Sequence, residues 1–143
     1  MTENSYSRSP CPLANRLDLL GDKWTLLIVR DLLLTDRSEF GHFLYAGEGI
    51  STNILSDRLE KLQLAGVVTK QPHPDHGKKF VYKLTDKGLG LAPTIIEMTL
   101  WGNQHLDNTD MPAALLTMMK NDREQILSLI RSREPLVRII GNE

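Results

Sequence analysis

Residues 47–66, which read GEGISTNILSDRLEKLQLAG, decide the fold class of this chain. Ser51 is a favourable N-cap, and the residues after it predict a helix that ends at Ala65-Gly66. Its apolar residues recur at helical spacing and predict one buried face: Ile54, Leu55, Leu59 and Leu62. The opposite face carries polar side chains that have no place in a core: Ser51, Thr52, Asn53, Ser56, Asp57, Lys61 and Gln63.

The segment before this helix completes a two-helix unit. Phe40, Phe43 and Leu44 predict a short helix, and Gly47 and Gly49 supply a turn. Two helices around a glycine-containing turn are typical of a helix-turn-helix, whose second helix enters the major groove of DNA. Hydroxyl and amide groups at the start of the second helix can form hydrogen bonds with base edges. We therefore expect four residues to read bases: Ser51, Thr52, Asn53 and Ser56. The alternative is a polar face that is merely solvated.

The segment after this helix predicts a β-hairpin of the kind called a wing. Val67–Pro72 and Lys79–Leu84 are β-prone and flank the turn cluster Pro74-Asp75-His76-Gly77. The chain has 17 basic and 18 acidic residues, but residues 61–83 hold five lysines and one acid, a local +4 that leaves −5 on the other 120 residues. Such a strip favours attraction to phosphate in a restricted orientation. We therefore expect four phosphate contacts: Lys61, His76, Lys78 and Lys79.

The rest of the chain predicts further helices. Pro12–Leu20 follows the N-cap Cys11, and a second helix runs from Asp22 to Leu34. Another runs from Thr85 towards Trp101, with a kink or a split at Pro93. Asn103–Asp110 reads as a polar linker. Residues 111–132 carry an apolar helical stripe and form one long helix or two short ones, with Asn121 and Glu124 resembling a capping box.

Length and composition restrict the class of protein. The 143 residues favour one domain, and a single cysteine excludes an internal disulfide framework and a zinc site with two or four cysteines. No apolar run approaches the roughly 20 residues of a membrane span, and residues 1–10 lack the apolar core of a secretory signal. We expect a cytoplasmic protein with no membrane partner, no cofactor, no metal and no catalytic residue.

Taken together, these motifs resemble the HxlR type of transcription regulator, winged helix-turn-helix proteins related to the MarR family. The resemblance covers residues 11–102 and is carried by Cys11-Pro12-Leu13, residues 19–28 (LLGDKWTLLI), Gly49-Ile50-Ser51, residues 55–59 (LSDRL), residues 65–68 (AGVV), residues 82–88 (YKLTDKG) and Trp101-Gly102. It implies a cytoplasmic homodimer on a roughly palindromic operator, with the first and fifth helices at the dimer interface. It also implies that Cys11 is a candidate sensor, since the matching cysteine of several relatives senses oxidants, aldehydes or quinones.

Two positions depart from the family pattern. Basic residues are usual around the third helix, where this chain has Glu39, Leu44 and Tyr45, which weakens the expected backbone binding there. The usual proline-rich wing strand with Val-Glu-Tyr is replaced by Phe80-Val81-Tyr82.

Three residue types leave alternatives open. Arg58 contacts a phosphate or pairs with an acid inside the monomer. Cys11 is a small buried hydrophobe, or a thiol whose thiolate is favoured by the helix start and which oxidants or electrophiles modify. Without a second cysteine, oxidation would require a disulfide between subunits or with a small thiol. His73 and His76 have no third or fourth metal ligand near them in the sequence. A phosphate contact at His76 is therefore a plainer interpretation than a metal site.

The sequence therefore predicts a mainly α protein with a small β-hairpin wing. We expect a flexible tail (1–10), a winged helix-turn-helix DNA-binding domain (11–102) and a C-terminal helical extension (103–143). The apolar stripe of the extension packs on its own subunit or on a dimer partner, and we favour the partner. The predicted function is a homodimeric repressor that binds double-stranded DNA and is switched at Cys11. A winged helix for protein contact is the alternative, and a cysteine-dependent enzyme has little support.

Overall fold

The computed structural model describes residues 9–107 and 110–133, and the predicted tail lies almost wholly outside these residues. The described chain is mainly helical with one antiparallel hairpin, as predicted. Its elements in order are α1 (Pro12–Leu20), α2 (Lys23–Leu34), α3 (Phe40–Leu44), α4 (Thr52–Leu64), β1 (Val68–Pro72), β2 (Phe80–Leu84), α5 (Asp86–Leu89), α6 (Ala92–His105), α7 (Ala113–Asn121) and α8 (Arg123–Arg131).

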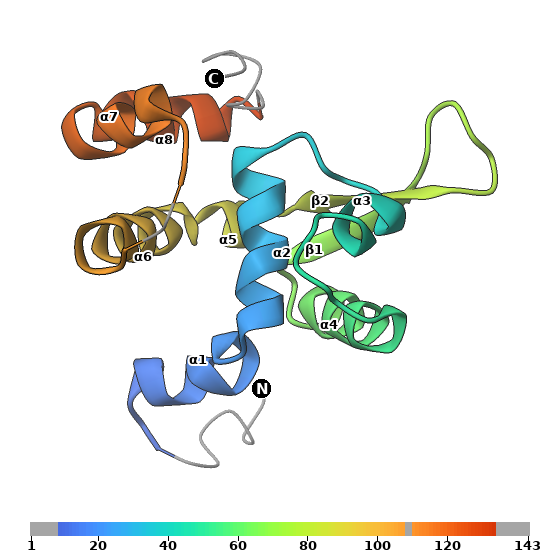
Figure 1. Ribbon diagram of the computed structural model, residues 1–143. Helices are drawn as coiled ribbons and strands as arrows, with labels where there is room; N and C mark the ends of the chain where they lie inside the picture. Colours follow the sequence, from blue (N-terminus) through green and yellow to red (C-terminus); the bar gives the residue numbers. More distant parts are fainter. Residues whose placement is uncertain (1–8, 108–109, 134–143) are drawn as a thin grey trace.

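Helix α2 is the centre of the fold. As predicted, Asp22 caps it, accepting hydrogen bonds from the backbone N–H groups of Trp24 and Thr25. Its core residues, among them Ile28 and Val29, are almost fully buried. Helices α3 and α4 and the hairpin lie on one side of α2, and α6, α7 and α8 lie on the other (Figure 1). Helix α2 therefore lies between the helix-turn-helix with its hairpin and the C-terminal helices.

The helix-turn-helix forms where the sequence predicts it. Gly47 and Gly49 have φ angles of +99° and +84°, a left-handed conformation that glycine adopts without strain, so the chain can reverse between α3 and α4. Ser51 caps α4 through its hydroxyl oxygen, which accepts from the Ile54 N–H. Leu55, Leu59 and Leu62 are buried, which confirms three of the four residues predicted for the inner face of α4, whereas Ile54 is only half-buried.

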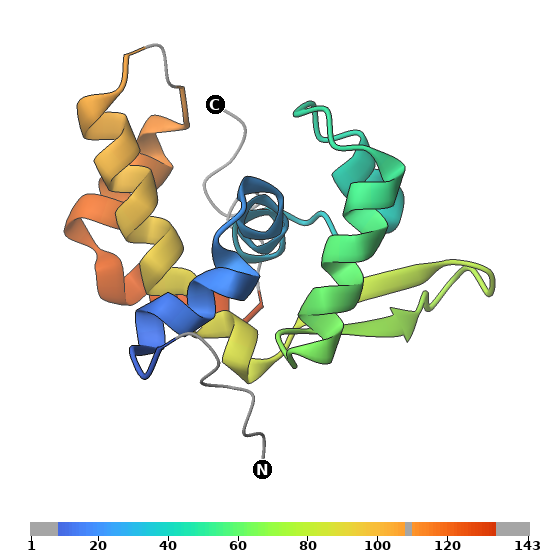
Figure 2. The same ribbon diagram turned by 90° about the horizontal axis from the view of Figure 1, so that it is seen from below.

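The hairpin pairs Val68 with Leu84 and Pro72 with Phe80. Its base is part of the core, since Val68, Tyr82 and Leu84 are buried and the ring of Tyr82 meets that of Phe43 edge-on. The strands then extend away from the body, and Figure 2 shows the turn of the wing at the outer end of the hairpin. A buried base and an exposed tip fix the direction of the wing.

The predicted helix from Thr85 towards Trp101 is split. Thr85 caps α5, and Pro93 lies in the first turn of α6, where its missing N–H needs no partner. The predicted start of the polar linker, at Asn103, is wrong, because α6 continues to His105.

The C-terminal segment forms two helices rather than one. The predicted capping box of Asn121 and Glu124 is wrong: the N-cap of α8 is Asp122, and its side chain makes no capping hydrogen bond. Helix α7 instead continues to Asn121. A one-residue connection therefore joins the two helices.

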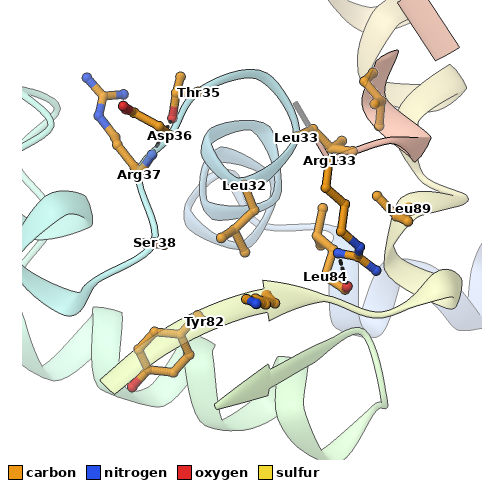
Figure 3. A pocket seen from close by; sticks show the side chains of 12 residues that line it. Leu32, Leu33, Thr35, Asp36, Arg37, Ser38, Tyr82, Leu84, Leu89 and Arg133 are labelled. Carbon is orange, nitrogen blue, oxygen red and sulfur yellow. Dashed lines mark hydrogen bonds between the residues drawn. The ribbon is translucent and has the colours of Figure 1, made fainter. Parts of the chain in front are cut away.

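The apolar stripe of the C-terminal segment packs on its own subunit. Leu115, Met119, Ile126 and Ile130 are buried in the same core as α2, α4 and the base of the hairpin. The preference for a partner subunit is therefore wrong for these four side chains, because they are already covered within the monomer. The Arg133 guanidinium also donates to the Leu84 carbonyl at 2.8 Å (Figure 3), which connects the end of α8 to the base of the wing.

Candidate nucleic-acid interface

The start of α4 presents an exposed polar surface. Ser51, Thr52, Asn53 and Ser56 are all exposed, and the wing lies beside the same helix. The Ser51 oxygen already accepts the capping hydrogen bond from Ile54, which leaves its hydroxyl proton and one lone pair for another partner. Thr52, Asn53 and Ser56 therefore offer the wider choice of donors and acceptors.

Arg58 pairs with acids inside the monomer, the second of the two alternatives left open by the sequence. Its Nε lies 3.1 Å from Asp22 Oδ1, and its Nη1 lies 2.5 Å from Asp57 Oδ2. These two acids raise the pKa of Arg58, with Asp22 the larger cause. Burial pushes the pKa of Asp22 up, but hydrogen bonds from Thr25 and Arg58 outweigh it and leave the pKa lowered. Arg58 thus orients α4 on α2.

The distal part of α4 is less positive than the sequence count implies. Lys61 is exposed, but its Nζ lies 3.3 Å from Asp57 Oδ2. Glu60 is exposed one helical turn beyond Ser56 and was not among the predicted site residues. Its position four residues after Ser56 places it on the same face of α4, which is visible in the sequence. A carboxylate at this position repels phosphate and can accept from a cytosine amino group.

The wing tip carries three of the predicted phosphate ligands. His76, Lys78 and Lys79 are exposed, with Lys79 Nζ 3.7 Å from Glu39 Oε1. The ring of His76 packs against that of His73, their centroids 4.8 Å apart. Within the described residues, no group of three or more candidate metal ligands converges, so these two histidines do not form part of such a cluster.

Glu39, one of the departures from the family pattern, connects α3 to the wing. Its Oε2 lies 3.4 Å from His73 Nε2 and 3.6 Å from His42 Nε2. His42 Nδ1 accepts in turn from the backbone N–H groups of Ser38 and Glu39. This acid, which stands where relatives usually have a basic residue, therefore contacts His42, His73 and Lys79 near the outer end of the two strands.

The lysine strip of residues 61–83 does not form one continuous surface. Lys70 pairs across the hairpin with Tyr82, while Lys83 pairs with Thr69. Paired residues share a face and successive residues alternate, so Lys70 and Lys83 lie on opposite faces of the hairpin. Lys70 is further placed with its Nζ 4.4 Å from the centre of the Phe80 ring.

An ion-pair network lies directly behind the turn that leads into α4. Arg30 on α2 holds Glu48 through two hydrogen bonds of 2.6 and 2.8 Å and also pairs with the buried Asp31. The hydrogen bond from Arg30 is the main reason why the pKa of Glu48 is lowered. This pair could not be predicted from a local pattern, because Arg30 and Glu48 are 18 residues apart in the chain.

Cys11 is exposed and is the N-cap of α1, as predicted, without a side-chain capping bond. The buried alternative is thereby excluded in the monomer. Its backbone N–H donates to the Ser9 hydroxyl at 3.0 Å, and its carbonyl accepts from the Asn15 amide at 3.2 Å. The thiol is accessible at the start of a helix in which no residue is buried.

A short helix, a glycine turn, a second helix with an exposed polar start and a following hairpin define a winged helix-turn-helix DNA-binding protein. Residues 19–110 match the HxlR-like helix-turn-helix family, and the chain belongs to that family. It is a transcription regulator of that class, which supports DNA binding over the alternative of a protein-contact module.

Two relatives are transcriptional regulators of the helix-turn-helix type. The regulator sll1512 of Synechocystis is 33% identical over 107 residues, 75% of this chain and 78% of that protein. YvaP of Bacillus subtilis is 36% identical over 98 residues, 68% of this chain and 90% of that protein.

Solved structures agree with this assignment. PA1607, a putative transcription factor, matches with a TM-score of 0.64 and 35% identity over 78% of this chain and 75% of its own. The reduced form of the B. subtilis regulator YodB matches with a TM-score of 0.57 and 31% identity over 70% of this chain and 98% of its own. YodB has also been solved diamide-treated and quinone-bound. The redox regulator HypR in its reduced form matches with a TM-score of 0.60 and 26% identity over 68% of this chain and 95% of its own.

Among the residues that the structure describes, none of the helices combines the length and the hydrophobicity that a membrane span requires.

Proposed function

We propose that this regulator is a homodimeric repressor that reads a roughly palindromic operator with α4 and holds its phosphates with the wing. The main observation behind this proposal is that Thr52, Asn53 and Ser56 are exposed on α4. This helix lies beside the wing, whose tip carries lysines. Two such units related by a twofold axis would present two α4 helices to successive major grooves. A cytoplasmic location follows from the DNA partner.

The homodimer is supported by apolar surface that the monomer leaves uncovered. Helix α1 has nine residues, none of them buried, and Leu13 and Leu17 are 67% and 48% exposed. Met98 and Trp101 on α6 are 55% and 62% exposed. A helix this short is marginal without packing. Leu19 of α1 packs against the core but Leu13 and Leu17 stay exposed, so a second copy would supply the remaining contact. We assign the dimer contact to α1 and α6.

The proposed switch is chemical modification of Cys11. Its exposure at the start of the proposed dimer helix supports this, as do the diamide-treated and quinone-bound forms of YodB. The thiolate would add to a quinone ring or to an aldehyde carbon, with a proton then taken up by the adduct. Alternatively, two thiols would form a disulfide while diamide takes up both hydrogens. Added bulk or a cross-link at α1 would change the spacing of the two α4 helices.

A band-shift titration with the upstream intergenic DNA tests the DNA-binding role. The double variant Lys78→Ala/Lys79→Ala is expected to bind more weakly and to lower the slope of log affinity against log salt by about 2, since each phosphate contact contributes about 0.9. Lys120→Ala, which removes an exposed lysine from α7, is the matched control and should leave binding unchanged. Equal binding by the double variant and the control would favour the protein-contact role instead.

A further inference from the structure

A mostly apolar cavity of about 360 Å³ lies between α2, α6 and α7. Its apolar wall includes Leu34 from α2, Met98 from α6, and Met111 and Leu115 from the C-terminal segment. We call this space the α2–α6–α7 cavity. Its volume is in the usual range for small-molecule sites. Apolar walls hold water poorly, so a cavity of this size favours an apolar occupant.

The charges around the cavity indicate a neutral occupant. Arg30 is the basic residue of the lining, and its guanidinium is already held by Asp31 and Glu48 through four hydrogen bonds of 2.6 to 3.0 Å. Asp110 adds a carboxylate to the lining. An anionic ligand would therefore meet a compensated cation and a repelling acid. The amide of Asn103, also on the lining, can donate and accept a single polar contact.

We propose that the α2–α6–α7 cavity binds a small, neutral, largely apolar molecule and that Arg30 transmits its presence to α4, the recognition helix of the helix-turn-helix. Arg30 lines the cavity, and its guanidinium group holds Glu48 in the turn directly before α4. A ligand that displaces the guanidinium would loosen this turn and alter the position of Ser51 and the start of α4. The transmission step rests on the proposed DNA-binding function, whereas the binding site does not.

Fluorescence titration of the full chain with N-phenyl-1-naphthylamine tests the site. This neutral probe brightens in apolar surroundings, and its sulfonated analogue 8-anilinonaphthalene-1-sulfonate adds a negative charge to the same ring system. We expect saturable binding of one neutral probe per subunit and about tenfold weaker binding of the sulfonate. Equal affinity for the two probes, or binding that does not saturate, would overturn the proposal.

The variant Gly102→Leu fills the cavity from α6. A Cβ at Gly102 meets Leu106 Cδ1 at 3.9 Å, an ordinary contact distance, so the helix can accept the larger residue. We expect the Kd of the neutral probe to rise about tenfold or more. Thr117→Leu places the same side chain on the exposed face of α7 and is the matched control. Thermal unfolding followed by circular dichroism shows that both variants are folded, and Thr99→Leu is a second variant that fills the cavity. Unchanged affinity in both filled variants would place the probe elsewhere and refute the site.

The transmission step is tested by band shift in the presence of the neutral probe. With the wild-type chain, we expect saturating probe to weaken binding to the intergenic DNA by about fivefold, near the lower end of usual allosteric couplings. Glu48→Gln removes the charge that Arg30 holds, so it should bind the probe with unchanged Kd while its DNA affinity no longer responds. A wild-type chain that binds the probe with no change in DNA affinity would overturn the transmission step. Absence of DNA binding without probe would contradict the proposed function but not the cavity, because the fluorescence titration contains no DNA.

Discussion

Arg58 Nε lies 3.1 Å from Asp22 Oδ1, so the recognition helix α4 is ion-paired to the N-cap residue of the central helix α2. The same Asp22 oxygen accepts hydrogen bonds from the N–H groups of Trp24 and Thr25, at 2.9 and 3.2 Å. One carboxylate therefore caps α2 and orients α4. This double role explains why a basic residue in the middle of a DNA-reading helix faces the protein.

Removing this carboxylate should destabilise the fold. Asp22→Ala is expected to lower the free energy of unfolding by about 1–2 kcal/mol, since α2 loses its N-cap. Asp22→Asn keeps a good capping group and loses the charge, so it should cost less than the alanine variant. Urea denaturation measures both, with Asp75→Ala on the exposed wing tip as control. Equal losses for the alanine and asparagine variants would assign the effect to the ion pair rather than to the cap.

The Arg30–Glu48 pair should make stability depend on pH in the acid range. The folded-state pKa of Glu48 is lowered below 4.5 by the hydrogen bond from Arg30, so its stabilisation is complete above the unfolded pKa and is lost as pH falls through the folded pKa. Glu48→Gln should be less stable than the wild type by about 0.5–1 kcal/mol at neutral pH, as expected for a partly exposed pair. Chemical denaturation from neutral pH down to about pH 3 should show this difference shrinking below the unfolded pKa of Glu48. A difference that stays constant across that range would contradict the assignment.

Asn53 should carry base discrimination rather than general affinity. Asn53→Ala is expected to weaken operator binding by about 1–3 kcal/mol, the usual worth of a good base contact, and to leave binding to unrelated DNA unchanged. Competition band shifts with operator and unrelated duplexes measure the two affinities separately. Asn121→Ala, on the exposed end of α7, is the control. An equal loss on both duplexes would assign Asn53 to the phosphate backbone.

Cys11 should control release from DNA. In the wild-type chain, diamide or methylglyoxal is expected to abolish the band shift, because the exposed thiol at α1 becomes modified. Cys11→Ser keeps a side chain of similar size without the thiol and should remain bound under the same treatment. Intact-mass measurement of the treated protein identifies the adduct or the disulfide. If the serine variant is released as readily as the wild type, the sensing role is wrong.

The dimer contact should depend on the exposed leucines of α1. Leu17→Glu is expected to shift the protein from dimer to monomer in sedimentation equilibrium, because a charge in an apolar contact must be desolvated. Leu64→Glu replaces another exposed leucine, at the end of α4, and should leave the oligomeric state unchanged. A dimer that persists in Leu17→Glu would place the interface away from α1.

Local patterns predicted most of the fold because their causes are local. The caps at Asp22, Ser51 and Thr85 and the glycine turn before α4 all formed as expected, and so did the buried face of α4 apart from Ile54. The errors fall where a local pattern competes with packing. Residues 103–105 are polar yet helical, since α6 continues to His105. The stripe of α7 and α8 is amphipathic in the sequence, but nothing in it says which apolar surface it covers.

The sequence by itself determined the fold class, the position of the recognition helix and the polar residues at its start, because helix periodicity and capping act within a few residues. Only the tertiary structure decided that Arg58 faces Asp22, that Lys70 and Lys83 lie on opposite faces of the wing, and that Arg30 holds Glu48. These relationships join residues that are distant in the chain or depend on strand pairing. Side-chain charge can be counted from the sequence, but its partner is set by packing.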